Sequence, residues 1–367
     1  MKFRAAVLHE INAPLAIETV ELAGLQPGDV LVRIHACGLC HTDLEAVQGS
    51  LRFPLPIVLG HEAAGVVEAV GSGVRQVAPG DHVVCSWNPS CGQCFYCEGG
   101  QPILCEALAR HLPQGRLPDG GTRLTLGGEP VHHFLCISGL AEYAVLPEAG
   151  AIPVPKELPF EAACLIGCGV MTGAGAALNV AQVAVGESVA VLGCGGVGLN
   201  AVQGARLAGA GRIIAVDLDP AKLEAARGFG ATDGVVAGED AAERIKALTD
   251  GRGADVVLEA GGHPATFRLA FEGLRPGGRA VILGKVDVER EVSFRWGSMM
   301  GERRMVRSSY GGTRPRRDFP LLGRLYLEGK LKLDELVTRR IGLDEVNDGF
   351  ARLARGDGVR TVVTFEG

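Results

Sequence analysis

One short segment constrains the fold of this chain more than any other. Ser188-Val189-Ala190-Val191-Leu192 reads as a buried strand, and the next six residues, Gly193-Cys194-Gly195-Gly196-Val197-Gly198, fit G-x-G-x-x-G. In this motif the first glycine permits a tight turn, the second lets a pyrophosphate approach the backbone, and the third lets helix and strand pack closely. The helix that follows would offer N–H groups and its positive dipole end to phosphate. The segment therefore predicts a dinucleotide site.

The chain around this turn alternates strand-like and helix-like runs. Strands are expected at 188–192, 212–216, 234–236, 255–259, 279–283 and 304–306, with a helix near 199–207 and another capped by Asp219 with Pro220 at its first position. Such alternation predicts a doubly wound parallel sheet.

Asp217 ends the second of these strands. A carboxylate there can accept both ribose hydroxyls of NAD and would repel the 2′-phosphate of NADP. The alternative is a simple strand-end or helix-capping acid. Lys222, one helical turn further on, is either a second ribose contact or a solvated surface lysine.

The first 150 residues have a different pattern. Short apolar runs at 30–34, 64–70 and 82–84 are bounded by Gly, Pro and Asp, with no long helical period, which predicts an irregular β-barrel. Near the C-terminus a helix is expected around 344–354 and a strand at 360–365, which could extend the parallel sheet or return to the first domain.

Composition limits the classes of function. The 367 residues suffice for about two domains, and 47% hydrophobic against 21% charged residues predicts packed cores. A net charge of −6 without a basic block argues against a nucleic-acid partner. The N-terminus lacks the apolar core of a signal peptide, and the apolar stretch at 189–199 is too short for a bilayer, so we expect a cytoplasmic protein without a membrane partner. Eleven cysteines in such a protein are more often ligands or core residues than disulfides.

Four of these cysteines lie close together in the sequence. Cys91, Cys94, Cys97 and Cys105 form C-x2-C-x2-C-x7-C. Four thiolates without a histidine or an open position suit a structural zinc ion, with an iron–sulfur cluster as the chemical alternative.

Three further segments pair ligand-type residues with glycines, and each is weak alone. They are Cys37-Gly38-Leu39-Cys40-His41-Thr42-Asp43, Gly60-His61-Glu62 and Leu165-Ile166-Gly167-Cys168-Gly169. A lone histidine or cysteine in such a setting is more often structural. Their order along the chain, with the cysteine cluster and the glycine turn, resembles that of the zinc-containing medium-chain alcohol dehydrogenases, and Gly358-Val359-Arg360-Thr361 adds to the likeness.

This resemblance implies a fold and a set of metal ligands. The fold would be a GroES-like β-barrel catalytic domain over 1–169, completed by 313–367, and a Rossmann NAD-binding domain over 170–312. Cys40, His61 and Cys168 would bind a catalytic zinc ion and leave one position for water or substrate, which makes two zinc ions per chain. Cys37 would be a core residue.

The resemblance also assigns supporting roles. Asp43 would fix the tautomer of His61, and Glu62 would lie near the metal. Thr42 would relay the substrate proton, which then passes to Glu45 or to water. The remaining roles concern NAD: His41 and Arg360 near its phosphates and Thr172 near its nicotinamide.

The implied reaction is hydride transfer between a primary or aromatic alcohol and NAD, giving the aldehyde. Leu51, Trp87, Phe134 and Leu135 match pocket positions near the substrate. S-(hydroxymethyl)glutathione or polyol dehydrogenases are alternatives within the family, although Leu51 and Ala109 stand where the glutathione branch has an acid and an arginine. A non-catalytic NAD-binding protein is a remote alternative. The family forms homodimers and homotetramers, and the long segment 106–133 resembles that of dimeric members.

Overall fold

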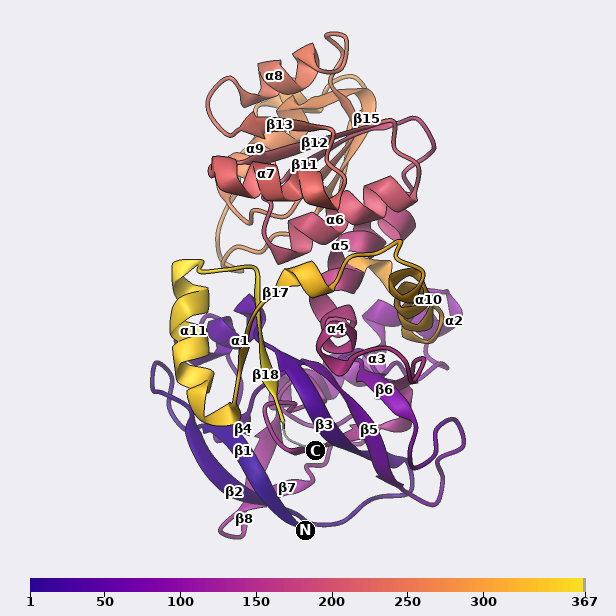
Figure 1. Ribbon diagram of the computed structural model, residues 1–367, viewed down its shortest axis with the longest axis vertical. Helices are drawn as coiled ribbons and strands as arrows, with labels where there is room; N and C mark the ends of the chain where they lie inside the picture. Colours follow the sequence, from indigo (N-terminus) through magenta and orange to yellow (C-terminus); the bar gives the residue numbers. More distant parts are fainter. Residues whose placement is uncertain (366–367) are drawn as a thin grey trace. The chain divides into compact units, whose positions relative to one another are not determined.

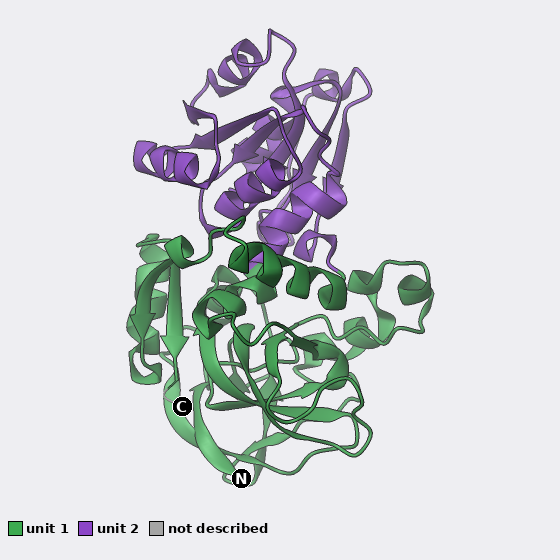
Figure 2. Ribbon diagram, turned by 45° about the vertical axis from the view of Figure 1, so that its right-hand side comes forward, with its two compact units in different colours: residues 1–168, 314–367 green, residues 169–313 purple. Residues whose placement is uncertain are grey.

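The computed structural model describes residues 1–365, which form two compact units (Figure 2). Unit 1 contains Met1–Cys168 and the chain from Arg314 onward, and unit 2 contains Gly169–Thr313. These divisions lie within one residue of those expected from the sequence, after residues 169 and 312.

A closed barrel forms one part of unit 1. Its strands follow the order β1 (Lys2–Leu8), β2 (Ala16–Leu22), β7 (Leu124–Leu126), β8 (Glu129–His133) and β4 (Ile57–Val58). Inward side chains such as Phe3, Val7, Val20, Leu124 and Val131 fill its small core. The predicted GroES-like β-barrel fold is confirmed.

A larger sheet forms the rest of unit 1. Its order is β10 (Ala151–Pro153), β6 (His82–Cys85), β5 (Glu62–Val70), β3 (Asp29–Gly38), β18 (Arg360–Thr364) and β17 (Val337–Ile341), and β9 (Tyr143–Pro147) also pairs with β3. β18 runs antiparallel to β3, with Val362 opposite Gly38. The C-terminal strand therefore returns to the first unit, one of the two outcomes that the sequence left open (Figure 1).

Short helices connect these strands, and the sequence pattern did not predict most of them. They are α1 (His41–Gln48), α2 (Phe95–Glu98), α3 (Glu106–His111), α10 (Pro315–Leu327) and α11 (Val346–Arg355), with 3-10 turns η1 (Pro102–Leu104), η2 (Leu112–Gln114), η3 (Glu148–Gly150), η8 (Asp334–Leu336) and η9 (Leu343–Glu345).

Unit 2 is a six-stranded parallel sheet. The order is β13 (Asp233–Val236), β12 (Arg212–Asp217), β11 (Ser188–Leu192), β14 (Ala254–Glu259), β15 (Leu274–Ile282) and β16 (Arg304–Arg307). Numbered from β11, this is the 3-2-1-4-5-6 order of the doubly wound dinucleotide-binding fold. Its helices are α6 (Gly196–Leu207), α7 (Pro220–Phe229), α8 (Ala241–Ala247) and α9 (Pro264–Glu272), with turns η6 (Trp296–Met299) and η7 (Tyr310–Gly312). The predicted Rossmann sheet is confirmed.

A continuous helical stretch carries the chain from unit 1 into unit 2. It comprises α4 (Phe160–Leu165), the π-helical η4 (Ile166–Val170), α5 (Met171–Gly175) and the π-helical η5 (Ala176–Val180). By length and composition this stretch could span a membrane: an 18-residue window of it has a mean hydropathy of 1.6, but 72% of that window is buried inside the protein.

Candidate functional site

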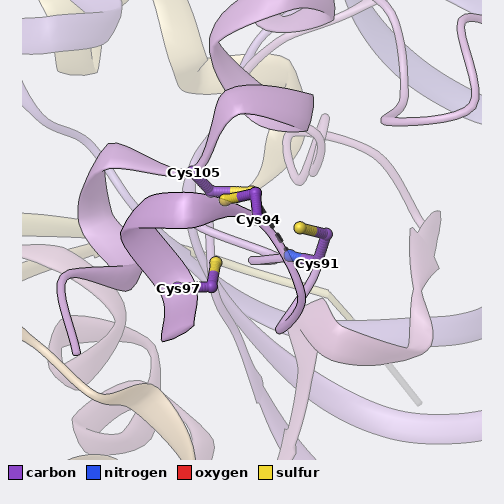
Figure 3. Close-up of side chains that lie close together, drawn as sticks. All are labelled: Cys91, Cys94, Cys97 and Cys105. Atoms are coloured by element: carbon purple, nitrogen blue, oxygen red, sulfur yellow. Dashed lines mark hydrogen bonds between the residues drawn. The ribbon is translucent and has the colours of Figure 1, made fainter. Parts of the chain in front are cut away.

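Four cysteine sulfurs gather in a lobe of unit 1. The Sγ atoms of Cys91, Cys94, Cys97 and Cys105 all lie within 4.8 Å of one another, and Figure 3 shows the side chains pointing toward a common centre. Cys94 caps α2 and Cys97 lies within it, while Cys105 precedes α3. The four cysteines that are close in the sequence thus form one compact cluster in the structure.

The chemistry of this cluster fits a divalent cation. Backbone N–H groups of Glu106 and Cys97 lower the pKa of the Cys94 thiol to about 6, which favours the thiolate that a metal requires. Burial and neighbouring thiols instead raise the pKa of Cys97 to about 12. Four sulfurs this close cannot all ionise without a compensating positive charge, which zinc would supply.

A second cluster joins three segments that lie far apart in the sequence. Cys40 precedes α1, His61 precedes β5, and Cys168 lies in the π-helical turn η4. Their ligand atoms, with a Glu62 carboxylate oxygen, lie within 4.8 Å of one another. His61 Nε2 is 3.3 Å from Cys168 Sγ. One imidazole and two sulfurs therefore converge as a Cys2His set requires, which makes this cluster a fitting zinc site.

Asp43 holds the imidazole of His61 from its other side. Asp43 Oδ2 lies 3.0 Å from His61 Nδ1, and both side chains are buried. The carboxylate is itself fixed, because Oδ1 accepts the N–H of Gly60 at 2.9 Å and Oδ2 accepts the N–H of Cys40 at 3.2 Å. This second bond closes a capping box at the start of α1, so one aspartate orders the helix and orients the imidazole.

Glu62 and Arg360 form a buried charged pair beside these sulfurs. Arg360 Nε lies 3.8 Å from Glu62 Oε2, with side chains 6% and 0% exposed. Burial raises the pKa of Glu62 to about 7, although Arg360 opposes this shift. The structure therefore places Arg360 against Glu62, next to the sulfur and imidazole groups.

In unit 2 the backbone of the turn at residues 193–198 requires glycine at some positions and leaves open space at another. Gly193 has φ of +89°, which favours glycine. A Cβ atom at Gly198 would lie 1.8 Å from the Gly193 carbonyl oxygen, so helix and strand pack too closely for any side chain. A Cβ at Gly195 would meet nothing within 4 Å, which leaves room for a pyrophosphate above the turn.

Asp217 stands at the end of β12, next to this turn. Its Oδ2 accepts the N–H of Cys194 at 2.7 Å, and its Oδ1 accepts the N–H of Asp219 at 3.0 Å. The expected helix cap is also present, because Asp219 Oδ1 accepts the N–H of Ala221 at 2.9 Å. The carboxylate that would bind ribose is thus fixed by the turn that would bind phosphate.

Comparison with known proteins assigns the family. Residues 26–156 match the alcohol dehydrogenase GroES-like domain, and residues 196–328 match the zinc-binding dehydrogenase domain. The chain is 40% identical to an S-(hydroxymethyl)glutathione dehydrogenase of Escherichia coli, with both sequences covered completely. The chain belongs to the zinc-containing medium-chain alcohol dehydrogenases. It is therefore a zinc-dependent alcohol dehydrogenase and an oxidoreductase.

Two solved structures extend this likeness over the whole chain. An alcohol dehydrogenase zinc-binding domain protein from Burkholderia ambifaria is 38% identical with a TM-score of 0.96. Benzyl alcohol dehydrogenase from Acinetobacter calcoaceticus is 32% identical with a TM-score of 0.94. Each comparison covers 100% of both chains.

The other residues with predicted roles lie in helices of the two units. Thr42 and Glu45 lie three residues apart in α1, so they share one side of the helix, whereas His41 is exposed at its start. In unit 2, Thr172 lies in α5 and Lys222 is exposed in α7. Their roles toward substrate and coenzyme stay predictions. Cys37 is buried in the core and is not part of the Cys40 cluster, as expected.

The residues predicted to line the pocket all pack on the main core of unit 1. Leu51 and Trp87 are partly buried, whereas Leu135 is 8% and Phe134 0% exposed. The Phe134 ring meets the His61 ring edge-on, with centroids 5.8 Å apart. Phe134 therefore contacts a predicted metal ligand, which the sequence did not indicate.

Proposed function

We propose that this dehydrogenase catalyses NAD-linked, zinc-dependent oxidation of a primary or aromatic alcohol to the aldehyde. One observation carries the proposal: Cys40, His61 and Cys168 converge within one unit, and Asp43 lies behind the imidazole. A non-catalytic NAD-binding protein would have no need to keep this set of ligands.

Each group has a chemical task in this reaction. A zinc ion held by Cys40, His61 and Cys168 would act as a Lewis acid that stabilises the alkoxide of the substrate. Asp43 keeps the proton on His61 Nδ1, which leaves Nε2 free to bind metal. Thr42 would take the proton of the alcohol and pass it to Glu45 or to water.

The coenzyme assignment rests on unit 2. Gly193, Gly195, Gly196, Val197 and Gly198 would bind the pyrophosphate at the start of α6, and Asp217 would accept the ribose hydroxyls. We expect NAD rather than NADP because the Asp217 carboxylate would repel a 2′-phosphate. Two zinc ions per chain follow from the two ligand clusters.

The substrate assignment rests on the apolar side chains that are predicted to line the pocket. Phe134 meets the imidazole, and Leu51 and Trp87 pack on the same core. Such walls favour an apolar alcohol over a polyol. The likeness to benzyl alcohol dehydrogenase supports an aromatic substrate.

S-(hydroxymethyl)glutathione is the second candidate substrate, because the 40% identical relative is a dehydrogenase of that compound. Leu51 and Ala109 argue against it, since neither side chain can form an ion pair with the charged groups of glutathione. The choice is open to a direct kinetic test.

That test is a steady-state panel with NAD and four substrates: benzyl alcohol, allyl alcohol, ethanol and S-(hydroxymethyl)glutathione. We expect the highest kcat/KM for benzyl alcohol, at least tenfold above that for the glutathione adduct. Preference for the adduct would replace the aromatic assignment. Failure to oxidise any of the four would contradict the proposed reaction.

We propose further that the protein forms a homodimer or homotetramer in the cytoplasm. β16 is an edge strand of the parallel sheet, and Val306 within it is exposed; Trp296, Met299 and Met300, in the segment before β16, are exposed too. A sheet-edge strand and exposed large apolar side chains each favour association with another chain. Light scattering during size-exclusion chromatography would show a monomer mass if this proposal is wrong.

A further inference from the structure

A tight turn of unusual backbone conformation lies beside His61. Within residues 134–138, Leu135, Cys136 and Ser138 have φ of 51°, 58° and 62°, although none of them is glycine. L-residues avoid this left-handed region, so such a conformation persists only where its surroundings enforce it, and it often marks a functional site. The turn therefore needs an explanation beyond chain reversal.

Hydrogen bonds from inside the turn fix Phe134. The N–H of Phe134 donates to Ser138 Oγ at 3.0 Å, while the carbonyl of Phe134 accepts the N–H groups of Ile137 and Ser138. Ser138 is 1% exposed, so this hydroxyl is shielded from water. Both backbone groups of Phe134 are thus satisfied within the turn, and the left-handed φ of Ser138 brings its hydroxyl to Phe134.

The turn also binds the backbone segment that precedes His61. The N–H of Gly139 donates to the Gly60 carbonyl at 2.8 Å, and the N–H of Leu140 donates to the Leu59 carbonyl at 2.9 Å. Gly60 has φ of +96°, and a Cβ there would lie 2.4 Å from the Leu140 nitrogen. This close approach leaves the turn and the backbone before His61 no room to shift independently.

The ring of Phe134, whose backbone the turn fixes, packs against the imidazole of His61. The Phe134 ring lies edge-on to His61 at 5.8 Å and edge-on to Phe53 at 5.0 Å. Asp43 and Cys168 contact the two ring nitrogens of His61, and contacts at the nitrogens alone leave the ring free to tilt about the line that joins them. A buried ring against its face or edge removes that freedom. Cys136 anchors the turn elsewhere, because it packs in a separate cluster with Cys105, Leu108 and Leu117.

We propose that the turn at residues 134–138 is a positioning element for His61, in which Ser138 holds Phe134 against the imidazole. This inference rests on the proposed metal-binding role of His61. Ser138 and Phe134 act through His61 and contact no metal themselves. The expected consequence of loosening the turn is faster loss of metal from the Cys40–His61–Cys168 site.

The test compares zinc release from Ser138→Ala and Ser138→Gly to a chromogenic chelator. Both variants remove the hydroxyl, and glycine adopts positive φ without strain, so Ser138→Gly keeps the test valid if the alanine variant misfolds. A His61→Ala variant identifies which release phase belongs to the His61 site. The matched control is Thr249→Ala in unit 2, where a buried hydroxyl likewise accepts a backbone N–H four residues away, from Gly253.

We expect the His61-site phase to accelerate about tenfold in both Ser138 variants, as is usual when support of a metal ligand is lost. In the Ser138 variants, zinc release from the four-cysteine site should keep its wild-type rate. In Thr249→Ala, zinc release from both sites should keep its wild-type rate. Wild-type release from the His61 site, or equal acceleration of both phases, would overturn the positioning role. A wild-type protein that holds no zinc at the His61 site would instead refute the proposed function.

Discussion

The two nitrogens of His61 have different surroundings, and we expect Asp43 to keep the proton on the nitrogen that it contacts. Nδ1 faces a carboxylate that two backbone N–H groups hold in place, and Nε2 faces the sulfurs. In Asp43→Asn the amide no longer favours the proton on Nδ1, so we expect zinc affinity at this site to fall about 10–100-fold. Competition with a chelator of known affinity measures this change.

A matched control for Asp43→Asn is Asp318→Asn. Asp318 is also buried in unit 1, where it accepts the N–H of Arg314 at 2.7 Å, and it is not part of either ligand cluster. This variant should lose stability without losing zinc affinity. Equal zinc affinity in wild type and Asp43→Asn would show that Asp43 serves only to cap α1.

We also expect one side chain to decide the choice between NAD and NADP. Asp217 is held at the glycine turn by the N–H of Cys194, where a carboxylate repels a 2′-phosphate. Asp217→Gly should lower the ratio of kcat/KM for NAD to that for NADP by about tenfold or more, which corresponds to the loss of one charged contact. An unchanged ratio would remove Asp217 from the ribose site.

Some residues of the candidate site could be predicted from the sequence and others could not. The four cysteines near residue 100 were found from their spacing, and the three glycines of the turn from their spacing together with the strand before them and the helix after them. Cys40, His61 and Cys168 required the family resemblance, because ligands on separate segments have no common spacing. Ser138 was missed because a left-handed φ at serine leaves no sequence signal. The pocket role of Phe134 stays a prediction, and its contact with the His61 ring was not predicted from the sequence.

At the scale of elements, a buried network ties β8 to β3. Arg123 Nε donates to Asp29 Oδ2 at 2.6 Å, and the N–H of Arg123 donates to His133 Nε2 at 3.1 Å. Burial, with the nearby charge of Arg123, lowers the pKa of His133 to about 3. His133 therefore stays neutral in the folded barrel at pH values where an unfolded chain would bind a proton.

This shift predicts how stability depends on pH. The pKa of His133 is near 6.5 in the unfolded chain and about 3 in the folded protein. Below about pH 6.5 only the unfolded chain binds the proton, so the free energy of unfolding is highest above this pH and falls as the pH decreases toward 3. His133 alone should cost about 2 kcal/mol of unfolding free energy between pH 7 and pH 5. Urea unfolding of wild type and His133→Gln at both pH values measures this difference. Identical losses in the two proteins would contradict the prediction.

Helices and strands could be predicted where the local pattern of apolar residues matched the burial of the element in the folded protein. Every expected strand of unit 2 formed, because buried parallel strands read as short apolar runs. α1 was missed in a region that reads as β-rich, although Cys40 and Asp43 form its capping box. The stretch from α4 to η5 was also missed, because its glycines and its two π-helical segments interrupt any regular helical period.

At the scale of the molecule, the chain leaves unit 1 after Cys168 and returns at Arg314. Both ligand clusters lie in unit 1, and the glycine turn lies in unit 2. Residue pattern alone identified the parallel sheet and the barrel. It left open where β18 would lie, because a short apolar strand fits either sheet, and only its pairing with β3 decides.

Zinc content, measured together with activity, tests the central claim most directly. The claim is that Cys40, His61 and Cys168 hold a catalytic metal, distinct from that of the four cysteines. Elemental analysis should find two zinc ions per chain in wild type and one in Cys168→Ala. The variant should also lose benzyl alcohol oxidation by about a thousandfold or more, since Lewis-acid stabilisation contributes several kcal/mol. A Cys168→Ala protein with two zinc ions and wild-type turnover would contradict the account.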